Sequence, residues 1–324
     1  MADKKIIAVA GATGAQGGGL VRAILNDPES EFTVRAFTRN KTSEKAQELE
    51  RMGAEVVEVD IDDAESLIKG LQGAYGAYLV TFFWEHFSPE KELQEAKNMA
   101  HAARETGVKH AIWSTLENTR DLISLDDDRM PTLMGKYKVP HFDAKGEANQ
   151  FFTDAGVPTT FLVTSFYWEN FIYFGMGPKK GQDGKLAITF PIGDKKLCSM
   201  SADDIGKCAY GIFRAGNDYI GKTVGISGEQ LTGGEMASEM SDVFGVDIGY
   251  NEVSPEAYRQ FGFPGAEDLG NMFQFNRDFE QICCDARSIS FSKKLNPELK
   301  SFKSWLVEHK EVISAGISKE LESI

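Results

Sequence analysis

The chain has 324 residues, of which 42% are hydrophobic and 26% charged, and its formal net charge is −14 at pH 7. This length accommodates one large α/β domain and a smaller lobe, and the composition is that of an ordinary globular protein. An acidic surface repels the backbone of DNA and RNA, so we expect no direct nucleic-acid binding. No segment is long and apolar enough for a membrane span, and four cysteines are too few for a disulfide framework. We therefore expect a cytoplasmic protein with free thiols, with the nucleus as an alternative location.

Strand-like apolar segments alternate with helical patterns through the first half of the chain. This alternation predicts an α/β fold of the Rossmann type, a doubly wound parallel sheet with helices on both faces. The predicted strands are 5–10, 32–37, 56–59, 76–80, 109–113 and 158–163, and the predicted helices are 17–26, 41–52, 64–70, one from residue 88 onward, and 143–154.

The alternation stops after the sixth predicted strand. We therefore predict a Rossmann domain over residues 1–165 and a smaller mixed α/β C-terminal lobe over 166–324, with the chain crossing between them. The segment 118–140 is long for a connection in a compact domain, which is typical of a lid or a partner surface, although a passive loop is equally compatible. The elements predicted in the C-terminal half are a short strand at 186–190 and helices at 203–214, 232–244 and 255–261.

A glycine-rich turn directly follows the first predicted strand. It reads Gly11-Ala12-Thr13-Gly14-Ala15-Gln16-Gly17, a spacing variant of the dinucleotide-binding fingerprint. The first glycine permits a tight turn, the second lets the backbone approach a pyrophosphate, and the third lets the next helix pack closely on the sheet. The free N–H groups and positive dipole end of that helix then face the phosphates. The residues of this turn that we expect to contact a dinucleotide are Gly11, Thr13, Gly14, Ala15, Gln16 and Gly17.

The residues after the second predicted strand indicate which dinucleotide is bound. NAD-specific folds place an acid there to bond the ribose 2′-hydroxyl, but this chain has no acid between Glu31 and Glu44. It carries Arg39, Asn40 and Lys41 instead, and a guanidinium can donate two hydrogen bonds to a 2′-phosphate. We therefore predict NADP(H) rather than NAD(H) as the cofactor. Exposed charges on a loop would give the same pattern.

Further pocket residues are expected at the carboxyl ends of other strands, where ligands bind in open α/β sheets. The acids after the third strand lie near the adenine or serve only as helix N-caps, and the aromatic residues wall the nicotinamide pocket or pack in the core. These candidates are Asp60, Ile61 and Asp62 after the third strand, Thr81, Phe82 and Phe83 after the fourth, and Phe166, Tyr167 and Asn170 after the sixth.

Several short motifs together resemble the NmrA-like family, an atypical branch of the short-chain dehydrogenase/reductases, and most closely its vertebrate redox sensors. The motifs extend over nearly the whole chain and read GATGAQGG, VRAFTRN, GAEVVEVDIDD, VTFFWE, STLEN, HFDAKGE and FGFPGAEDLGNMF. The resemblance implies a Rossmann domain, a small C-terminal lobe and NADP(H) binding. It also implies a mostly regulatory role, in which the NADPH/NADP ratio is sensed and passed to a protein partner or to a second copy of the chain.

The enzymes related to this family use a serine, a tyrosine and a lysine four residues after the tyrosine. By resemblance, Ser114 and Lys145 match the first and the last of these, but His141 stands at the tyrosine position. An imidazole has an ordinary pKa of roughly 6.5 against about 10 for a phenol, so ordinary alcohol–ketone catalysis is not expected. Tyr167 is a candidate surrogate acid. Lys145 would hold the nicotinamide ribose, act as the acid/base if burial or a neighbouring cation lowers its pKa, or lie exposed on its helix.

Two functions are compatible with these residues. One is an NADP(H)-binding sensor, and the other is an NADPH-dependent reductase of a small aromatic, carbonyl or quinone substrate that uses Lys145. A cavity walled by His141, Lys145 and Tyr167 would favour chemistry, whereas a filled site would favour sensing. The five histidines are scattered without a metal-binding spacing, so no metal site is expected.

Overall fold

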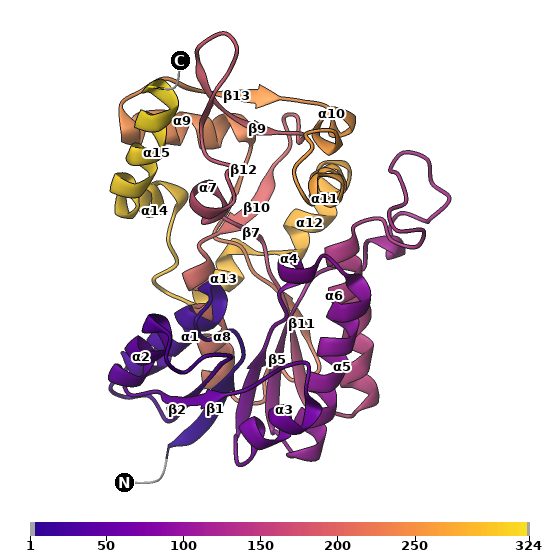
Figure 1. Ribbon diagram of the computed structural model, residues 1–324, viewed down its shortest axis with the longest axis vertical. Coiled ribbons are helices and arrows are strands. Elements are labelled where there is room, and N and C mark those ends of the chain that lie inside the picture. Colours follow the sequence, from indigo (N-terminus) through magenta and orange to yellow (C-terminus); the bar gives the residue numbers. More distant parts are fainter. Residues whose placement is uncertain (1–3, 323–324) are drawn as a thin grey trace.

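The computed structural model describes residues 4–322, which form two lobes. In Figure 1 the larger lobe is built on one extended sheet, and the smaller lobe, which contains the yellow C-terminal helices, lies above it. Within the described range no helix is long and apolar enough to cross a membrane.

Seven parallel strands form the large sheet in the order β11-β6-β5-β4-β1-β2-β3. The order reverses between β1 and β4, because β1 pairs with β2 on one side and with β4 on the other. Such a reversal leaves a crevice at the carboxyl ends of the two strands, where ligands bind in doubly wound folds. The strands are β1 (Lys5–Val9), β2 (Phe32–Thr38), β3 (Glu55–Glu58), β4 (Gly76–Leu79), β5 (His110–Thr115), β6 (Thr159–Val163) and β11 (Thr223–Gly225).

Both faces of the large sheet are buried. Ile7 and Val9 of β1 belong to one apolar core, whereas Ala8 and Ala10 belong to the core on the opposite face, as the period of two in a strand requires. On the first face lie α1 (Ala15–Leu25), α2 (Glu44–Arg51), α8 (Ala202–Arg214) and α13 (Ile289–Leu295). On the second lie α3 (Ala64–Leu71), α5 (Pro89–Glu105) and α6 (Pro140–Asp154).

Two glycines bring α8 against the first helix of the chain. A Cβ atom on Gly206 would lie 2.1 Å from the backbone nitrogen of Leu20, and one on Gly19 would lie 2.4 Å from the carbonyl oxygen of Asp203. The two backbones therefore approach more closely than side chains would allow. This contact anchors a helix from the second half of the chain on the Rossmann sheet.

The smaller lobe contains two three-stranded sheets, β12-β10-β7 and β13-β9-β8, and a group of short helices. Its core is rich in aromatic rings, among them Trp168, Phe190 and Trp305, all completely buried. The strands are β7 (Phe166–Tyr167), β8 (Lys179–Lys180), β9 (Leu186–Phe190), β10 (Leu197–Met200), β12 (Glu229–Leu231) and β13 (Ile248–Glu252). The helices are α7 (Asn170–Tyr173), α9 (Gly233–Phe244), α10 (Pro255–Arg259), α11 (Ala266–Asp278), α12 (Glu280–Ala286), α14 (Phe302–Glu308) and α15 (Lys310–Glu322).

The predicted fold class is confirmed, and all six predicted strands of the sheet are present. The seventh strand, β11, was not predicted because its three residues carry no strand pattern and form a strand only by pairing with β6. The first helix begins at Ala15 rather than Gly17, and the four-residue helix α4 (Phe83–His86) was missed. The division at residue 165 stays a prediction, although α8 and β11 both return from beyond it to the large sheet.

The segment 118–140 is held by hydrogen bonds to α11, where the Asn271 side chain donates to the carbonyl oxygen of Pro131 at 2.9 Å, and by hydrogen bonds within itself. Lys138 is completely buried, and its ammonium group donates to the carbonyl oxygens of Asp127 and Met130 at 2.7 and 2.6 Å. Its only helical turn is the 3-10 turn η1 (Thr119–Asp121). No residue of this segment lines the cleft described below, so it does not cover the candidate site in this conformation.

Candidate functional site

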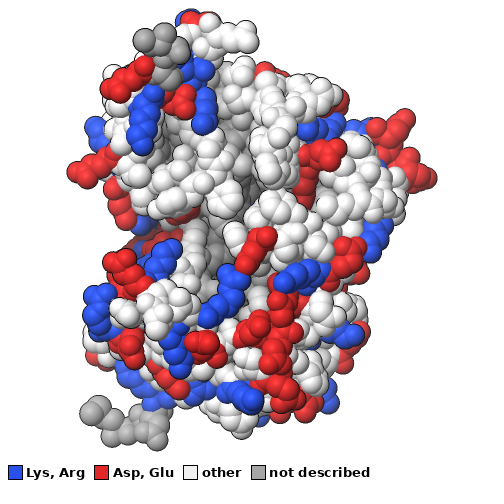
Figure 2. Space-filling model, viewed as in Figure 1, with Lys and Arg blue, Asp and Glu red and all other residues white. Residues whose placement is uncertain are grey.

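A cleft opens at the carboxyl ends of β1 and β4 and continues between the two lobes. Figure 2 shows this hollow, in which uncharged atoms prevail, while basic and acidic side chains are interleaved on the surrounding surface. Its volume is about 2290 Å³. Typical small-molecule sites have roughly 300–1,000 Å³. The cleft therefore has room for an extended ligand together with a second, smaller one.

The glycine-rich turn forms the floor of the cleft at the end of β1. Gly11 has a left-handed φ of +63°, and its carbonyl oxygen accepts a hydrogen bond of 2.8 Å from the Gly14 nitrogen. A Cβ atom on Gly17 would lie 2.4 Å from that oxygen, so only glycine lets α1 begin here. Gly14 is the N-cap of α1 and offers no side chain to its free N–H groups. An exposed turn with uncapped N–H groups fits a pyrophosphate.

Gln16 joins this turn to the interior of the sheet. Its side-chain nitrogen donates to the Tyr167 hydroxyl, and its side-chain oxygen accepts from the Tyr78 hydroxyl and, at 2.8 Å, from the Ser114 hydroxyl. Ser114 is buried and does not line the cleft. Burial raises the pKa of Tyr167 to about 12, which makes its hydroxyl a weaker acid. Ser114 therefore supports the turn rather than facing a substrate, whereas Tyr167 supports the turn and also lines the cleft.

Arg39 follows β2 and lines the cleft, as the sequence predicts for a residue beside a 2′-phosphate. The structure also shows a partner that the sequence did not reveal. The guanidinium of Arg39 is paired with the carboxylate of Glu85 from α4. No acid lies near Arg39 in the sequence. In the folded protein, however, the carboxylate of Glu85, from the helix that follows β4, lies beside it.

The neighbouring candidates have different positions. Asn40 and Lys41 do not line the cleft, and the Asn40 side-chain oxygen Oδ1 instead accepts from the Thr42 nitrogen at 2.9 Å in a turn before α2. Asp60, Ile61 and Asp62 do line it. None of these three caps α3, whose N-cap is Asp63.

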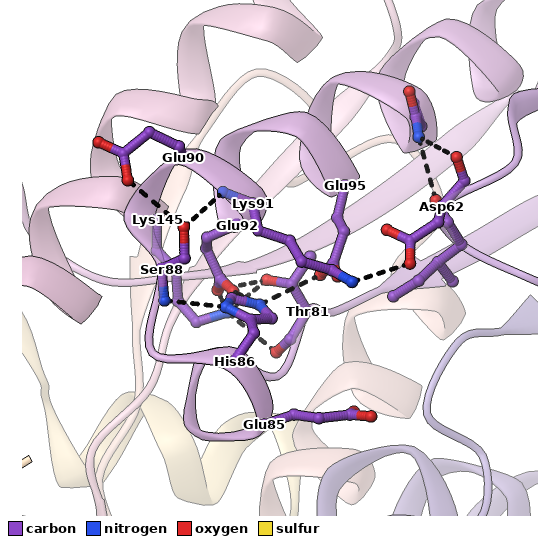
Figure 3. A network of polar contacts seen from close by, with 12 residues as sticks. Asp62, Thr81, Glu85, His86, Ser88, Glu90, Lys91, Glu92, Glu95 and Lys145 are labelled. Carbon is purple, nitrogen blue, oxygen red and sulfur yellow. Dashed lines mark hydrogen bonds and ion pairs between the residues drawn. The ribbon is translucent and has the colours of Figure 1, made fainter. Parts of the chain in front are cut away.

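Lys145 lies on α6 and reaches across to the end of β4 (Figure 3). Its ammonium group donates to the Thr81 hydroxyl at 2.7 Å and lies 2.7 Å from a carboxylate oxygen of Glu92 on α5. Burial would raise the pKa of Glu92, but the charge of Lys145 and the close contacts with His86, Lys145 and Thr81 lower it to about 2. Lys145 therefore has an anion beside it, not the neighbouring cation that lysine acid/base chemistry requires.

Figure 3 also shows His86, Glu92 and Glu95, whose ligand-type atoms lie within 4.8 Å of one another. The sequence prediction overlooked this group, although Glu92 and Glu95 are three residues apart on one helix. The Ser88 nitrogen donates to His86 Nδ1 at 3.0 Å, so the neutral ring carries its proton on Nε2, the atom that faces the carboxylates. A metal would need a lone pair on Nε2, so this arrangement does not fit a metal ligand. Burial and the Glu92 charge instead raise the pKa of Glu95 to about 7.

His141 lines the cleft one helical turn before Lys145. Its Nδ1 is 2.6 Å from a carboxylate oxygen of Asp268, and the other oxygen accepts from the His141 backbone nitrogen at 3.2 Å. Asp268 belongs to α11 of the smaller lobe, so this buried contact joins the lobes. The sequence prediction missed Asp268, because nothing near it in the sequence indicates its partner.

Aromatic side chains also line the cleft. The imidazole of His141 lies against Trp84, with 4.7 Å between ring centroids, and against Phe83, with 5.8 Å. Phe82 is 54% exposed at the mouth of the cleft. The remaining predicted pocket residues that line it are Thr81, Phe166, Tyr167 and Asn170.

The fold and this site define a Rossmann-type protein with a large crevice at the switch point of its sheet. The sequence pattern of the NmrA-like family matches residues 3–306, so the chain belongs to this family. The NmrA-like family domain-containing oxidoreductase FrzB of a Cladobotryum species is 30% identical over 297 residues, which are 84% of each chain.

Solved structures support the fold. The negative transcriptional regulator NmrA in complex with NADP superposes with a TM-score of 0.79 at 20% identity over 99% of this chain and 100% of that one. The triphenylmethane reductase of a Citrobacter species, complexed with NADP(H), superposes with a TM-score of 0.74 at 23% identity over 94% of this chain and 99% of the other. The solved structures with this fold thus include a regulator and a reductase, and the relative FrzB is named an oxidoreductase.

Proposed function

We propose that this chain is an NADP(H)-binding sensor, in which the cofactor controls how the two lobes contact each other or contact a partner. Gly11, Gly14 and Gly17 would hold the pyrophosphate, Arg39 the 2′-phosphate and Lys145 the nicotinamide ribose. A bound nicotinamide supplies hydride chemistry.

One observation carries this proposal. The position of the catalytic tyrosine holds His141, and its imidazole is bonded to Asp268 of the smaller lobe. A group that joins lobes is positioned to transmit occupancy of the cleft, and the pairing of Lys145 with Glu92 favours ribose binding over proton transfer. The partner is then a protein that distinguishes the two lobe arrangements, or a second copy of the chain.

Replacing Arg39 with alanine should remove the preference for NADP. A charged hydrogen bond to the 2′-phosphate contributes about 1.5–3 kcal/mol, so we expect roughly a 10- to 150-fold loss of NADP⁺ affinity and little change for NAD⁺. Isothermal titration calorimetry with both nucleotides measures this. Equal affinities in the unmodified protein would refute the preference for NADP(H).

A second function, reduction of a small aromatic, carbonyl or quinone substrate, is favoured by the space and the walls of the cleft. His141, Lys145 and Tyr167 all line it, and Phe82, Phe174 and Phe261 expose about half of their surfaces at its mouth, with 54%, 53% and 47% exposure. Flat apolar molecules bind such aromatic walls. FrzB is also named an oxidoreductase.

If this second function holds, the protein should consume NADPH with at least one compound from a panel of quinones and aromatic carbonyls. Replacing Lys145 with alanine should then lower the rate at saturating NADPH by roughly 10²- to 10⁴-fold, the usual effect of an acid/base group. Absorbance of NADPH follows the reaction. Lys136→Ala, an exposed lysine outside the cleft, is the control. An unchanged rate in Lys145→Ala would exclude the lysine mechanism.

A further inference from the structure

The four residues of α4 connect parts of the site that are distant in the sequence. Glu85 pairs with Arg39 at the end of β2, whereas Phe83 and Trp84 contact His141 on α6. His86 lies 3.5 Å from the Glu92 carboxylate. This short helix therefore lies between the expected 2′-phosphate position and the expected nicotinamide position.

The Arg39–Glu85 pair is open to exchange. The two side chains are 69% and 48% exposed, and an exposed ion pair of this kind contributes little stability. A phosphate carries more charge than a carboxylate and matches the fork of a guanidinium equally well. Glu85 is paired with one guanidinium nitrogen of Arg39, Nη1. A 2′-phosphate that takes two donors of Arg39 would compete with Glu85 for this nitrogen and favour its displacement.

Trp84 carries the contact from α4 to the smaller lobe. Its ring packs so closely on Gly265, the N-cap of α11, that a Cβ atom there would lie 2.8 Å from it. Phe87, which ends α4, has a φ of +53°, a conformation that is uncommon for a bulky residue and is held by its surroundings. A shift of Glu85 would thus alter the packing of Trp84 on α11.

We propose that Glu85 is a specificity-determining residue that holds Arg39 when no 2′-phosphate is bound, and that its displacement repacks Trp84 against the smaller lobe. This inference rests on the proposed NADP(H) binding and adds that α4 responds to the 2′-phosphate. In this proposal, α4 links the presence of the 2′-phosphate to the packing between the two lobes.

Replacing Glu85 with glutamine should raise the ratio of NADP⁺ to NAD⁺ affinity by about two- to fivefold, the effect of removing one exposed competing ion pair. Calorimetry with both nucleotides gives the ratio. Glu90→Gln is the matched control, because Glu90 also forms an exposed ion pair, with Lys136 at 3.0 Å, but lies outside the cleft. An unchanged or lower ratio in Glu85→Gln would overturn the specificity role.

Intrinsic fluorescence tests the repacking, because Trp84 is half-buried whereas Trp113, Trp168 and Trp305 are completely buried. Adenosine 2′,5′-bisphosphate should change the emission of the unmodified protein, whereas adenosine 5′-monophosphate at equal occupancy should not. The change should vanish in Trp84→Phe and be much smaller in Glu85→Gln, whose Trp84 is already released. A response to both nucleotides, or one that persists in Trp84→Phe, would contradict the coupling.

The two proposals fail in distinguishable ways. Equal affinity of the unmodified protein for NADP⁺ and NAD⁺ would defeat the proposed cofactor preference. A preference for NADP⁺ that depends on Arg39 but is indifferent to Glu85 would leave that preference intact and defeat only the role of Glu85.

Discussion

Replacing Gly17 with alanine should sharply weaken NADP⁺ binding and lower stability. The added Cβ atom would lie 2.4 Å from the carbonyl oxygen of Gly11 and 2.9 Å from that of Ala10. Both are backbone atoms, so α1 must move away from the turn that would hold the pyrophosphate. Overpacking of this kind costs about 1–3 kcal/mol, which corresponds to roughly a 5- to 150-fold loss of affinity. Calorimetry with NADP⁺ measures the loss.

A graded pair of controls separates this effect from misfolding. At Gly14 the added Cβ atom would lie 3.2 Å from the Gly11 oxygen, so Gly14→Ala should fold and lose less affinity than Gly17→Ala. At Gly234, in the first turn of α9, the nearest atom is 4.0 Å away, and Gly234→Ala should bind NADP⁺ like the unmodified protein. Unimpaired NADP⁺ binding in folded Gly17→Ala would show that the turn does not hold the nucleotide.

Replacing Glu117 with glutamine should produce the largest loss of stability. Its carboxylate pairs through both oxygens with the guanidinium of Arg287, whose side chain is 3% exposed. Arg287 also donates to the carbonyl oxygen of Thr164 at 2.8 Å. Burial would lower the pKa of Arg287, but the charge and hydrogen bonds of Glu117 raise it above its ordinary value, so the guanidinium stays charged.

The substitution would leave this buried charge without its counter-ion. Such a loss costs about 3–5 kcal/mol, and we expect the midpoint of thermal unfolding to fall by roughly 4–7 °C for a chain of this size. Calorimetry or circular dichroism measures the midpoint. The matched control is Glu31→Gln, which breaks an exposed pair with Lys5 at 2.7 Å and should shift the midpoint very little. Equal midpoints for the two variants would contradict the buried-charge argument.

The Glu117–Arg287 pair also has a bearing on the proposed sensing. Glu117 follows β5 of the large sheet, whereas Arg287 follows α12 of the smaller lobe. Together with the contact between His141 and Asp268, it joins the two lobes. If cofactor binding changes how the lobes contact each other, we expect the buried Glu117–Arg287 pair to stay intact and the exposed Arg39–Glu85 pair to be the one that is exchanged.

The sequence allowed confident prediction of features whose cause is local. The strand–turn–helix at Gly11 to Gly17 could be predicted because φ angles, close approach and helix start depend on residues adjacent in the chain. The first six strands could be predicted because each is an apolar run of strand length, but their order in the sheet was not predicted and comes from the structure. The short elements α4 and β11 could not be predicted, because neither has enough residues to form a pattern.

The candidate site divides in the same way. From the sequence alone, the phosphate turn and the arginine after β2 could be predicted, and the family resemblance pointed to His141 at the position of a tyrosine. Their partners became known only from the fold: Glu85 for Arg39, Glu92 for Lys145 and Asp268 for His141. Each partner comes from a different element, and Asp268 is 127 residues from His141. An ion pair depends on distance in space, so residue order cannot reveal it. The preference for NADP(H) is thus a prediction from the sequence, and the structure supplies the contacts that a bound nucleotide would change.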